Sequence, residues 1–275
     1  MDAQLQAKSE ALIACLRGMD SVIVALSGGV DSSLVAYTAH RALGERAFAV
    51  TSGSESLKRE DLDLTRQLTA RWGMNHLVIE TPELDNPDYG RNPVNRCYFC
   101  KTTLYDGLTR IARERGITHI ANGANLDDMG DHRPGMRAGT EYKVRSPLIE
   151  CGFRKTDIRA LAAAYGLPNA DKPQAACLAS RVPYGTSVSR ELLARIESAE
   201  RILGQMGFTQ YRVRHHGDVA RIEITPDQFA LAIERHDEIV QAIKACGYVF
   251  VTLDLAGFHS GSLNHSVVRS GGGKR

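Results

Sequence analysis

The segment Ser27-Gly-Gly-Val-Asp-Ser-Ser33 has the residue types and spacing of a phosphate-binding loop. It follows the apolar run Val22–Leu26, so we predict a strand, a glycine turn and then the start of a helix. Backbone N–H groups and the positive helix end at such a junction bind phosphate, and an aspartate there can hold Mg²⁺ between phosphates. The residues predicted to contact a nucleotide and its metal ion are Ser27, Gly28, Gly29, Asp31, Ser32 and Ser33. The loop matches neither G-x-x-x-x-G-K-[ST] nor G-x-G-x-x-G.

A second polar cluster directly follows the predicted strand 117–122. Its members are Asn125, Asp127, Asp128, Asp131, Arg133 and Arg137. Carboxylates at this place can share a magnesium ion and offset nucleotide charge, while an arginine can meet a phosphate or a substrate carboxylate. The alternative is a solvated loop whose aspartates cap the following turn. Beside a phosphate-binding loop, we favour the functional interpretation.

Cys97 and Cys100 are one helical turn apart near the predicted start of a helix, so both sulfur atoms can face one site as thiolates. Three interpretations stay open. A redox disulfide needs no further partner, a zinc site needs four ligands, and an iron–sulfur cluster needs three or four thiolates. Cys177, in a loop of small residues that also contains Arg181, is a candidate third thiolate. Cys15 and Cys246, at apolar helical positions, are expected to be inert, and Cys151 is expected on a loop without an evident partner.

The segment 212–223 places charged residues at alternate positions of two predicted strands. Arg212 and Arg214 share one face of the first strand, and Arg221 and Glu223 share a face of the next. Arginines in this arrangement can clamp a phosphate bidentately. The alternative is an exposed strand face with ion pairs between the strands.

Strands and helices alternate through the first part of the chain. Helices are predicted at 3–17, 32–43, 58–72, 101–115 and 155–165, and strands at 22–26, 47–51, 76–80 and 117–122. This alternation predicts an α/β fold, a parallel sheet with helices on both faces, whose ligands bind beyond the carboxyl ends of the strands. After the loop 168–188, a helix is predicted at 190–205, strands at 210–215 and 219–225, a helix at 227–245 and a strand at 248–254. We predict domains at 1–170 and 171–269, the second a smaller α+β domain, and a disordered tail at 270–275.

The composition is that of an ordinary globular protein. The chain has 275 residues, is 43% hydrophobic and 24% charged, and carries a formal net charge of +2, which gives no general case for binding nucleic acid or a membrane. Apolar runs stay far below the roughly 18 residues that span a bilayer, and Met1–Ser9 lacks the apolar core of a signal peptide. We therefore expect a cytoplasmic protein whose six cysteines serve as thiols, metal ligands or catalysts.

Over nearly its whole length the chain resembles the PP-loop ATP pyrophosphatases, in the branch of the LarE-type ATP-dependent sacrificial sulfur transferases. The resemblance is carried by SGGVDSS, RCYFCK, NGANLDD, ACLASRVPYG, RVRHHGDVARIEI and VTLDLAGFHSG. It implies an enzyme that uses ATP and Mg²⁺ to adenylate a carboxylate of a pyridinium-dicarboxylate mononucleotide. Sulfur then replaces the adenylate, leaving a thiocarboxylate, AMP and pyrophosphate, in the synthesis of a nickel-pincer nucleotide cofactor.

The resemblance also implies roles for particular residues. In one branch of the family, the cysteine matching Cys177 gives up its own sulfur; in another, three cysteines hold a 4Fe–4S cluster that carries an extra sulfide. Because this sequence has Cys97, Cys100 and Cys177, we expect the cluster. The substrate-binding residues implied are Arg181, Arg212, Arg214 and Glu223. The family also implies a homo-oligomer, a trimer or a hexamer.

Two other functions would keep the phosphate-binding loop. A tRNA thiolase combines such a loop with cysteines but needs a basic surface for the tRNA backbone, which a net charge of +2 does not favour. A non-enzymatic module that binds adenine nucleotides would have no use for three thiols. A synthetase coupled to an amidotransferase would need a glutaminase module, which the sequence lacks.

Overall fold

The computed structural model describes residues 1–129, 134–174 and 176–259. Asp131, Arg133 and the predicted tail at 270–275 lie outside these residues. The chain divides into two compact units. The first comprises Met1–Asn86 and Asn95–Ala175, and the second comprises Pro87–Val94 and Ala176–Arg275.

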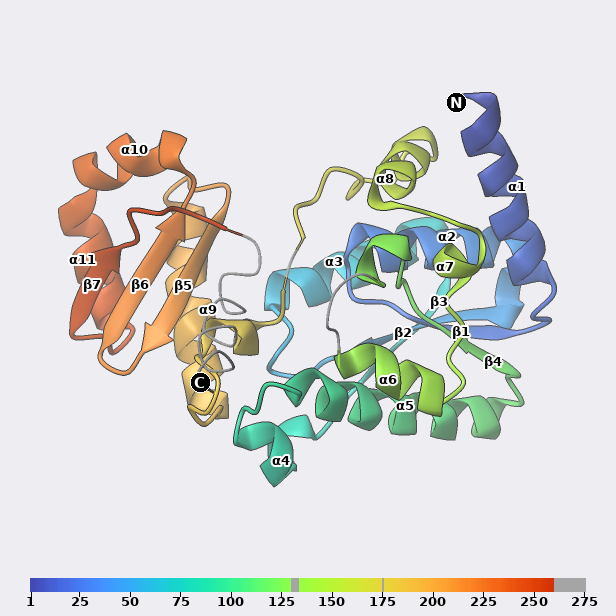
Figure 1. Cartoon of the computed structure of the whole chain (residues 1–275), viewed down its shortest axis with the longest axis horizontal. Helices are drawn as coiled ribbons and strands as arrows, with labels where there is room; N and C mark the ends of the chain where they lie inside the picture. Colours follow the sequence, from blue (N-terminus) through green and yellow to red (C-terminus); the bar gives the residue numbers. More distant parts are fainter. Residues whose placement is uncertain (130–133, 175, 260–275) are drawn as a thin grey trace, which may run out of the picture. The chain divides into compact units, whose positions relative to one another are not determined.

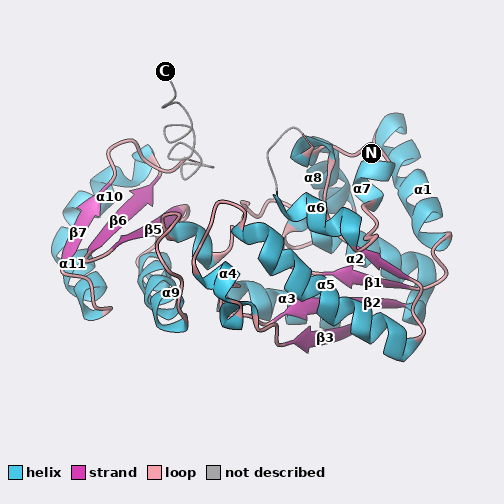
Figure 2. Cartoon of the chain, turned by 60° about the horizontal axis from the view of Figure 1, so that its bottom comes forward, coloured by secondary structure: helices cyan, strands magenta, loops and turns pink. Residues whose placement is uncertain are grey.

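The first unit is built on a parallel sheet of four strands in the order β3-β2-β1-β4, drawn in magenta in Figure 2. The strands are β1 (Val22–Ala25), β2 (Ala47–Ser52), β3 (Asn75–Ile79) and β4 (His119–Ala121). Val22 of β1 pairs with Ala47 of β2 on one side and with His119 of β4 on the other. The strand order reverses at β1, and in sheets of this kind ligands bind at the carboxyl ends of the strands beside such a reversal, here β1 and β4. The predicted α/β fold is confirmed.

Helices cover both faces of this sheet (Figure 1). They are α1 (Ala3–Arg17), α2 (Val30–Leu43), α3 (Arg59–Trp72), α5 (Arg96–Arg115), α6 (Pro134–Glu141), α7 (Pro147–Glu150) and α8 (Lys155–Ala164), with 3-10 turns η1 (Gly44–Arg46), η2 (Glu83–Asp85) and η3 (Leu126–Asp128). Val22 and Val24 pack with α1, α2, α7 and α8, whereas Ile23 packs with α5 and α6 on the opposite face. Every residue of the run Val22–Val24 is therefore buried, as its apolar, β-branched composition predicts.

The second unit has its own three-stranded sheet in the order β5-β6-β7. Its elements are α4 (Pro87–Gly90), η4 (Leu178–Arg181), α9 (Arg190–Gln205), β5 (Tyr211–His216), β6 (Val219–Ile224), η5 (Pro226–Gln228), α10 (Phe229–Glu234), α11 (His236–Ala245) and β7 (Phe250–Leu253). β5 and β6 are antiparallel, β6 and β7 are parallel, and α9 and α11 pack on the sheet around Val213 and Ile222. Asn92 attaches the segment Pro87–Val94 to this unit, because its side chain donates to the carbonyls of Val182 and Pro183.

Three expected elements differ from the structure. The helix expected at 101–115 begins at Arg96, so both cysteines of C-x-x-C lie inside it. No helix is predicted between residues 122 and 155, but this stretch contains α6 and α7, each of which begins at a proline, a residue suited to the first helical position. The helix expected at 227–245 is divided at Arg235, whose guanidinium donates to the carbonyl of Met206. Within the described ranges, no helix is both long and apolar enough to cross a membrane.

Candidate active site

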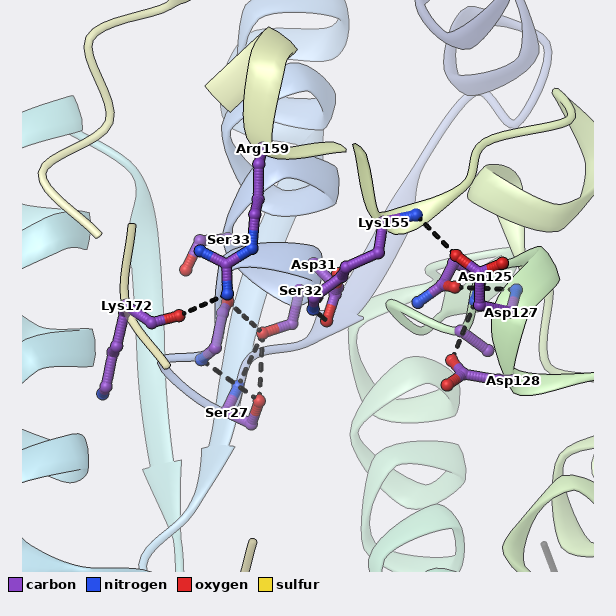
Figure 3. Close-up of polar contacts among 12 residues, drawn as sticks. Ser27, Asp31, Ser32, Ser33, Asn125, Asp127, Asp128, Lys155, Arg159 and Lys172 are labelled. Carbon is purple, nitrogen blue, oxygen red and sulfur yellow. Dashed lines mark hydrogen bonds and ion pairs between the residues drawn. The ribbon is translucent and has the colours of Figure 1, made fainter. Parts of the chain in front are cut away.

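The phosphate-binding loop connects β1 to α2 and is held in shape by its own serines (Figure 3). The hydroxyl of Ser32 accepts from the backbone N–H of Ser27 at 3.1 Å and donates to the carbonyl of Gly29 at 3.2 Å. Gly28 has a φ of +76°, and a Cβ there would lie 3.0 Å from the carbonyl oxygen of Asp61. Only glycine fits this turn without strain, which explains its place in the motif.

Gly123, just after β4, lies against the start of α2. A Cβ at Gly123 would come within 2.6 Å of the backbone nitrogen of Ser32 and 2.8 Å of its Cα. The absence of a side chain thus lets the second polar cluster approach the phosphate-binding loop. The two motifs, about ninety positions apart in the sequence, meet at the carboxyl edge of the sheet.

We expect Gly123→Ala to weaken ATP binding about 10- to 100-fold, because the added methyl group must displace the first turn of α2 and misplace its phosphate-binding amides. Titration calorimetry with a non-hydrolysable ATP analogue measures the effect. Gly139→Ala is the matched control, since its Cβ would make only ordinary contacts at 3.8 and 3.9 Å. Unchanged ATP affinity in Gly123→Ala would contradict the importance of this contact.

Asp31, in the first turn of α2, forms an ion pair with Lys155, the first residue of α8. The ammonium group lies 2.6 Å from Oδ1 and also contacts Oδ2, and both side chains remain about one quarter exposed, 30% for Lys155 and 24% for Asp31. A carboxylate can bind a magnesium ion and an ammonium group can bind a phosphate, so the pair has the chemistry that a metal-bound nucleotide needs. Figure 3 shows Lys155 extending to the start of α2.

Asn169 supports the loop from beneath. Its Nδ2 donates to the carbonyl of Gly28 at 3.1 Å and to the hydroxyl of Ser33 at 2.9 Å. The side chains of Asn169 and Ser33 are both buried. The hydroxyl of Ser33 is therefore engaged inside the protein, whereas the hydroxyl of Ser32, also in α2, lies 3.1 Å from that of Ser27 in the loop. Arg159 of α8 fixes the adjoining segment, because it donates to the carbonyls of Ala170 and Lys172 (Figure 3).

Asn125, Asp127 and Asp128 form a capped turn. The side chain of Asn125 accepts from the N–H of Asp127, and the carboxylate of Asp128 accepts from the N–H of Asn125, each at 3.0 Å. Asp127 also accepts from the N–H of Lys155 at 2.8 Å and from Arg154 at 2.7 Å. The backbone N–H of Lys155 is the main cause that lowers the pKa of the Asp127 carboxyl, with burial opposing it and Arg154 adding to the shift. The turn thus holds the start of α8, and through it Lys155, beside Asp31.

Cys97 and Cys100 lie in the first turns of α5. Cys97 is exposed and Cys100 is half-buried. Gly135, at the start of α6, lies next to Cys97, since its Cβ position is 3.5 Å from the Cys97 carbonyl oxygen and 3.9 Å from its Cβ. Two thiols at this spacing, close to a helix N-terminus, can serve as two thiolate ligands.

In the second unit, Arg181 organises the segment that carries Cys177. Its Nη1 donates to the carbonyls of Ala176 and Cys177, at 2.6 and 3.1 Å. The same guanidinium makes a bidentate pair with Glu200 of α9, at 2.7 and 3.0 Å, and both side chains are almost fully buried. Cys177 is exposed, and the Arg181–Glu200 pair fixes the backbone segment to which it belongs. Sequence reasoning missed Glu200, although an acidic residue in the apolar stripe of an amphipathic helix is a detectable signal.

Arg212 and Arg214 face the same side of β5, as predicted, and both are buried. Arg214 donates to Glu223 at 2.9 Å and to the carbonyl of Ser180 at 2.7 Å. Arg212 lies opposite Glu223 in the register but donates to the carbonyl of His259. Of the alternative, an exposed strand face with ion pairs between the strands, the exposure is wrong, because Arg212, Arg214 and Glu223 are at most 5% exposed. The ion pair between the strands is present, since Arg214 pairs with Glu223.

The charged groups around Arg212 include more arginines than carboxylates. This arginine cluster contains Arg181, Arg212 and Arg214 beside Glu200 and Glu223. Burial is the main cause that lowers the pKa of the Arg212 guanidinium to about 10, followed by the charges of Arg181 and Arg214. Arg212 forms no ion pair with a carboxylate among the residues that the structure describes. An anion placed beside Arg212 would relieve this repulsion, and the anionic groups that a guanidinium binds best are phosphates and carboxylates.

Cys15, one of the two cysteines expected to be inert, lies beside Cys151. Cys15 of α1 and Cys151, which follows α7, interact with one another, so the expectation that Cys151 has no partner is wrong. Burial, with smaller contributions from Cys151 and Glu150, raises the pKa of the Cys15 thiol to about 12. A thiol of this kind is a poor nucleophile, consistent with a packing role for Cys15.

The parallel sheet, with a Ser-Gly-Gly-Val-Asp-Ser-Ser turn between its central strand and the next helix, defines a PP-loop ATP pyrophosphatase domain. Residues 13–87 match the sequence model of the NAD synthase family. An uncharacterized protein of Synechocystis is 41% identical over 268 residues, covering 96% of this chain and all of its own. The pyridinium-3,5-bisthiocarboxylic acid mononucleotide synthase of Lactiplantibacillus plantarum is 35% identical over 269 residues, 98% of each chain. The chain belongs to this LarE-type family and is an ATP-dependent sulfur transferase.

A more distant relative is the tRNA-specific 2-thiouridylase of Azorhizobium caulinodans. It is 32% identical over 212 residues, which cover 62% of this chain and 53% of the relative. This partial match is consistent with a shared PP-loop domain, whereas the matches to the Synechocystis and Lactiplantibacillus plantarum proteins extend through both units.

Proposed function

We propose that this enzyme adenylates a carboxylate of a pyridinium-dicarboxylate mononucleotide and converts it into a thiocarboxylate, releasing AMP and pyrophosphate. The observation that supports this best is the buried arginine cluster of the second unit, which offers a cationic receptor for the phosphate of a small substrate. The relative from Lactiplantibacillus plantarum is named for the corresponding bisthiocarboxylic acid mononucleotide. The product would serve the synthesis of a nickel-pincer nucleotide cofactor.

In the adenylation step, the loop amides with Ser27 and Ser32 hold the phosphates of ATP. Asp31 would hold a magnesium ion, which would offset phosphate charge and leave Lys155 able to contact a phosphate. The ion pair supports this arrangement, because both of its members already lie at the loop. A substrate carboxylate attacks the α-phosphorus, and pyrophosphate leaves with its charge offset by the helix end and the ammonium group. Ser33 and Asn169 keep the loop in position. The turn of Asn125, Asp127 and Asp128 has one of two roles: it holds Lys155 in place, or its carboxylates share the metal ion.

For the substrate, we assign the phosphate to Arg212, with Arg214 and Glu223 as its supporting pair. Besides binding substrate, Arg181 positions the segment that carries Cys177, because its guanidinium donates to the carbonyls of Ala176 and Cys177. Adenylation turns a poor oxygen leaving group into AMP, after which sulfur attacks the acyl carbon.

We propose that Cys97, Cys100 and Cys177 are the thiolate ligands of a 4Fe–4S cluster. The first turns of α5 fit this role, since they carry two thiols three residues apart with a glycine beside them, and Cys177 is exposed. A cluster with three protein ligands would supply an open iron for sulfide. Anaerobic reconstitution should then give about four irons per chain, with much less in Cys97→Ala. Zinc uptake without iron would contradict the proposal.

The function is tested by measuring pyrophosphate release with three additions: the pyridinium-dicarboxylate mononucleotide, unmodified tRNA, or no acceptor. We expect release only with the mononucleotide, together with a thiocarboxylate in the product mass spectrum. Release with tRNA alone would favour a tRNA thiolase, the activity named for the relative from Azorhizobium caulinodans. We place the reaction in the cytoplasm, where ATP and reduced thiols are available, and propose a homo-oligomer, a trimer or a hexamer.

We expect Arg212→Gln to raise KM for the mononucleotide about 10- to 100-fold with little change in KM for ATP, because it removes one charged donor from the phosphate receptor. Steady-state kinetics with each substrate varied in turn separates the two effects. Arg214→Gln is the comparison, since it deprives the buried Glu223 of an arginine partner and should lower the free energy of unfolding by about 3 kcal/mol. If Arg212→Gln raises KM for ATP instead, the cluster is part of the nucleotide site.

A further inference from the structure

The first unit has a cavity at the carboxyl-terminal ends of α2, α3 and α8, the opposite end of α2 from the phosphate-binding loop. Its volume is about 490 Å³, which falls within the usual range of small-molecule sites. The side chains that line it are Tyr37, His40, Arg41, Arg71, Trp72 and Tyr165. Because α2 has 14 residues and a helix rises about 1.5 Å per residue, the cavity and the loop are about 20 Å apart.

Three aromatic rings form a connected wall of this cavity. The ring centroid of Tyr37 lies 5.4 Å from that of Trp72 and 5.5 Å from that of Tyr165. The Tyr165 hydroxyl lies 2.6 Å from the hydroxyl of Ser9, and all three rings are half-buried against the core. The rings are inclined to that of Tyr37 by 61° for Trp72 and 52° for Tyr165, so they can meet a planar ligand through edge-to-face or offset contacts.

Two arginines add positive charge to the same cavity. The guanidinium of Arg41 lies 5.7 Å from the ring centroid of Tyr37 and 5.0 Å from that of Tyr165. Neither Arg41 nor Arg71 pairs with a carboxylate within the part of the chain that the structure covers. Cations near helix carboxyl ends also stabilise the helices, so a binding measurement, rather than stability alone, must decide their role.

We propose that this cavity is a second ligand site, which takes a planar aromatic ring carrying a phosphate, as in AMP. The ring contacts the aromatic wall, and the phosphate binds the guanidinium groups of Arg41 and Arg71. This site goes beyond the proposed function, since sulfur transfer at the loop makes no use of it.

Trp72 provides a direct probe, because it is the single tryptophan of the chain and borders the cavity. We expect AMP to change its fluorescence with a Kd below about 1 mM. Adenosine lacks the phosphate and ribose 5-phosphate lacks the ring, so each should bind at least about 10-fold more weakly than AMP.

Variants separate this site from the loop. Arg71→Gln should raise the Kd for AMP at least about 10-fold. Arg66→Gln, on the same helix but paired with Asp63, should leave it unchanged, as should Asp31→Asn in the loop. Circular dichroism and sedimentation confirm that each variant is folded and has the oligomeric state of the wild type.

Three results would overturn the proposal: no fluorescence change up to about 10 mM AMP, equal affinity in Arg71→Gln, or a signal that disappears in Asp31→Asn. A change of oligomeric state in Arg71→Gln, without any effect of AMP on the wild type, would show that the cavity is a contact between protein chains.

Discussion

Replacing Asp31 with asparagine should lower the rate of adenylation about 100- to 1,000-fold. The carboxylate is the group of the loop that can bind a magnesium ion, and its partner Lys155 is the cation placed to take over a phosphate. An amide keeps the shape of the side chain but loses the charge that both interactions need. Exchange of radiolabelled pyrophosphate into ATP, in the presence of the mononucleotide, measures this step without requiring sulfur.

Asp63→Asn is the matched control, because Asp63 lies on the exposed side of α3 and pairs only with Arg66 among the described residues. We expect it to exchange pyrophosphate at the wild-type rate. The magnesium dependence adds a second criterion: Asp31→Asn should need more Mg²⁺ for half-maximal exchange. Full exchange activity in Asp31→Asn, at an unchanged magnesium requirement, would exclude Asp31 from the adenylation machinery.

Replacing Cys177 with alanine should reduce thiocarboxylate formation by at least about 1,000-fold while adenylation continues. The thiol lies on a backbone segment fixed by Arg181, so its removal takes away the sulfur-bearing group and leaves the support intact. Single-turnover reactions analysed by mass spectrometry measure the thiocarboxylate, and pyrophosphate release measures adenylation in the same sample.

Cys246→Ala is the control, since Cys246 lies in the same unit and its thiol donates to the carbonyl of Ala242. It should form the thiocarboxylate at the wild-type rate. The intact mass of the wild-type enzyme after turnover then distinguishes the two sulfur sources. Loss of the mass of hydrogen sulfide from Cys177 indicates a sacrificial cysteine, whereas an unchanged mass indicates sulfide carried by a cluster. Sulfur transfer that survives in Cys177→Ala would remove this residue from the reaction.

The sequence alone determined the class of fold and the phosphate-binding loop, because both follow from local patterns. The run Val22–Val24 is apolar at every position and is buried on both faces, and Gly28 adopts the positive φ that only its lack of a Cβ permits without strain. The alternation of strands and helices likewise predicted the parallel sheet. The sequence did not predict the short helices that begin at Pro134 and Pro147. Such helices have too few turns to show a periodic pattern of apolar residues.

Only the tertiary structure decided which residues support the site. Lys155 reaches Asp31 across 124 positions of sequence, and Asn169 reaches Ser33 across 136, contacts that no local pattern encodes. The same holds for Glu200, whose pairing with Arg181 requires α9 to pack beside η4. The alternation of charged residues in the segment 212–223 also did not show whether their strand face is buried. A strand with charged residues on one face can present that face to water or to other charges. The side chains of Arg212, Arg214 and Glu223 are buried together since each gains a polar partner that replaces water, and that compensation exists only once the second unit has folded.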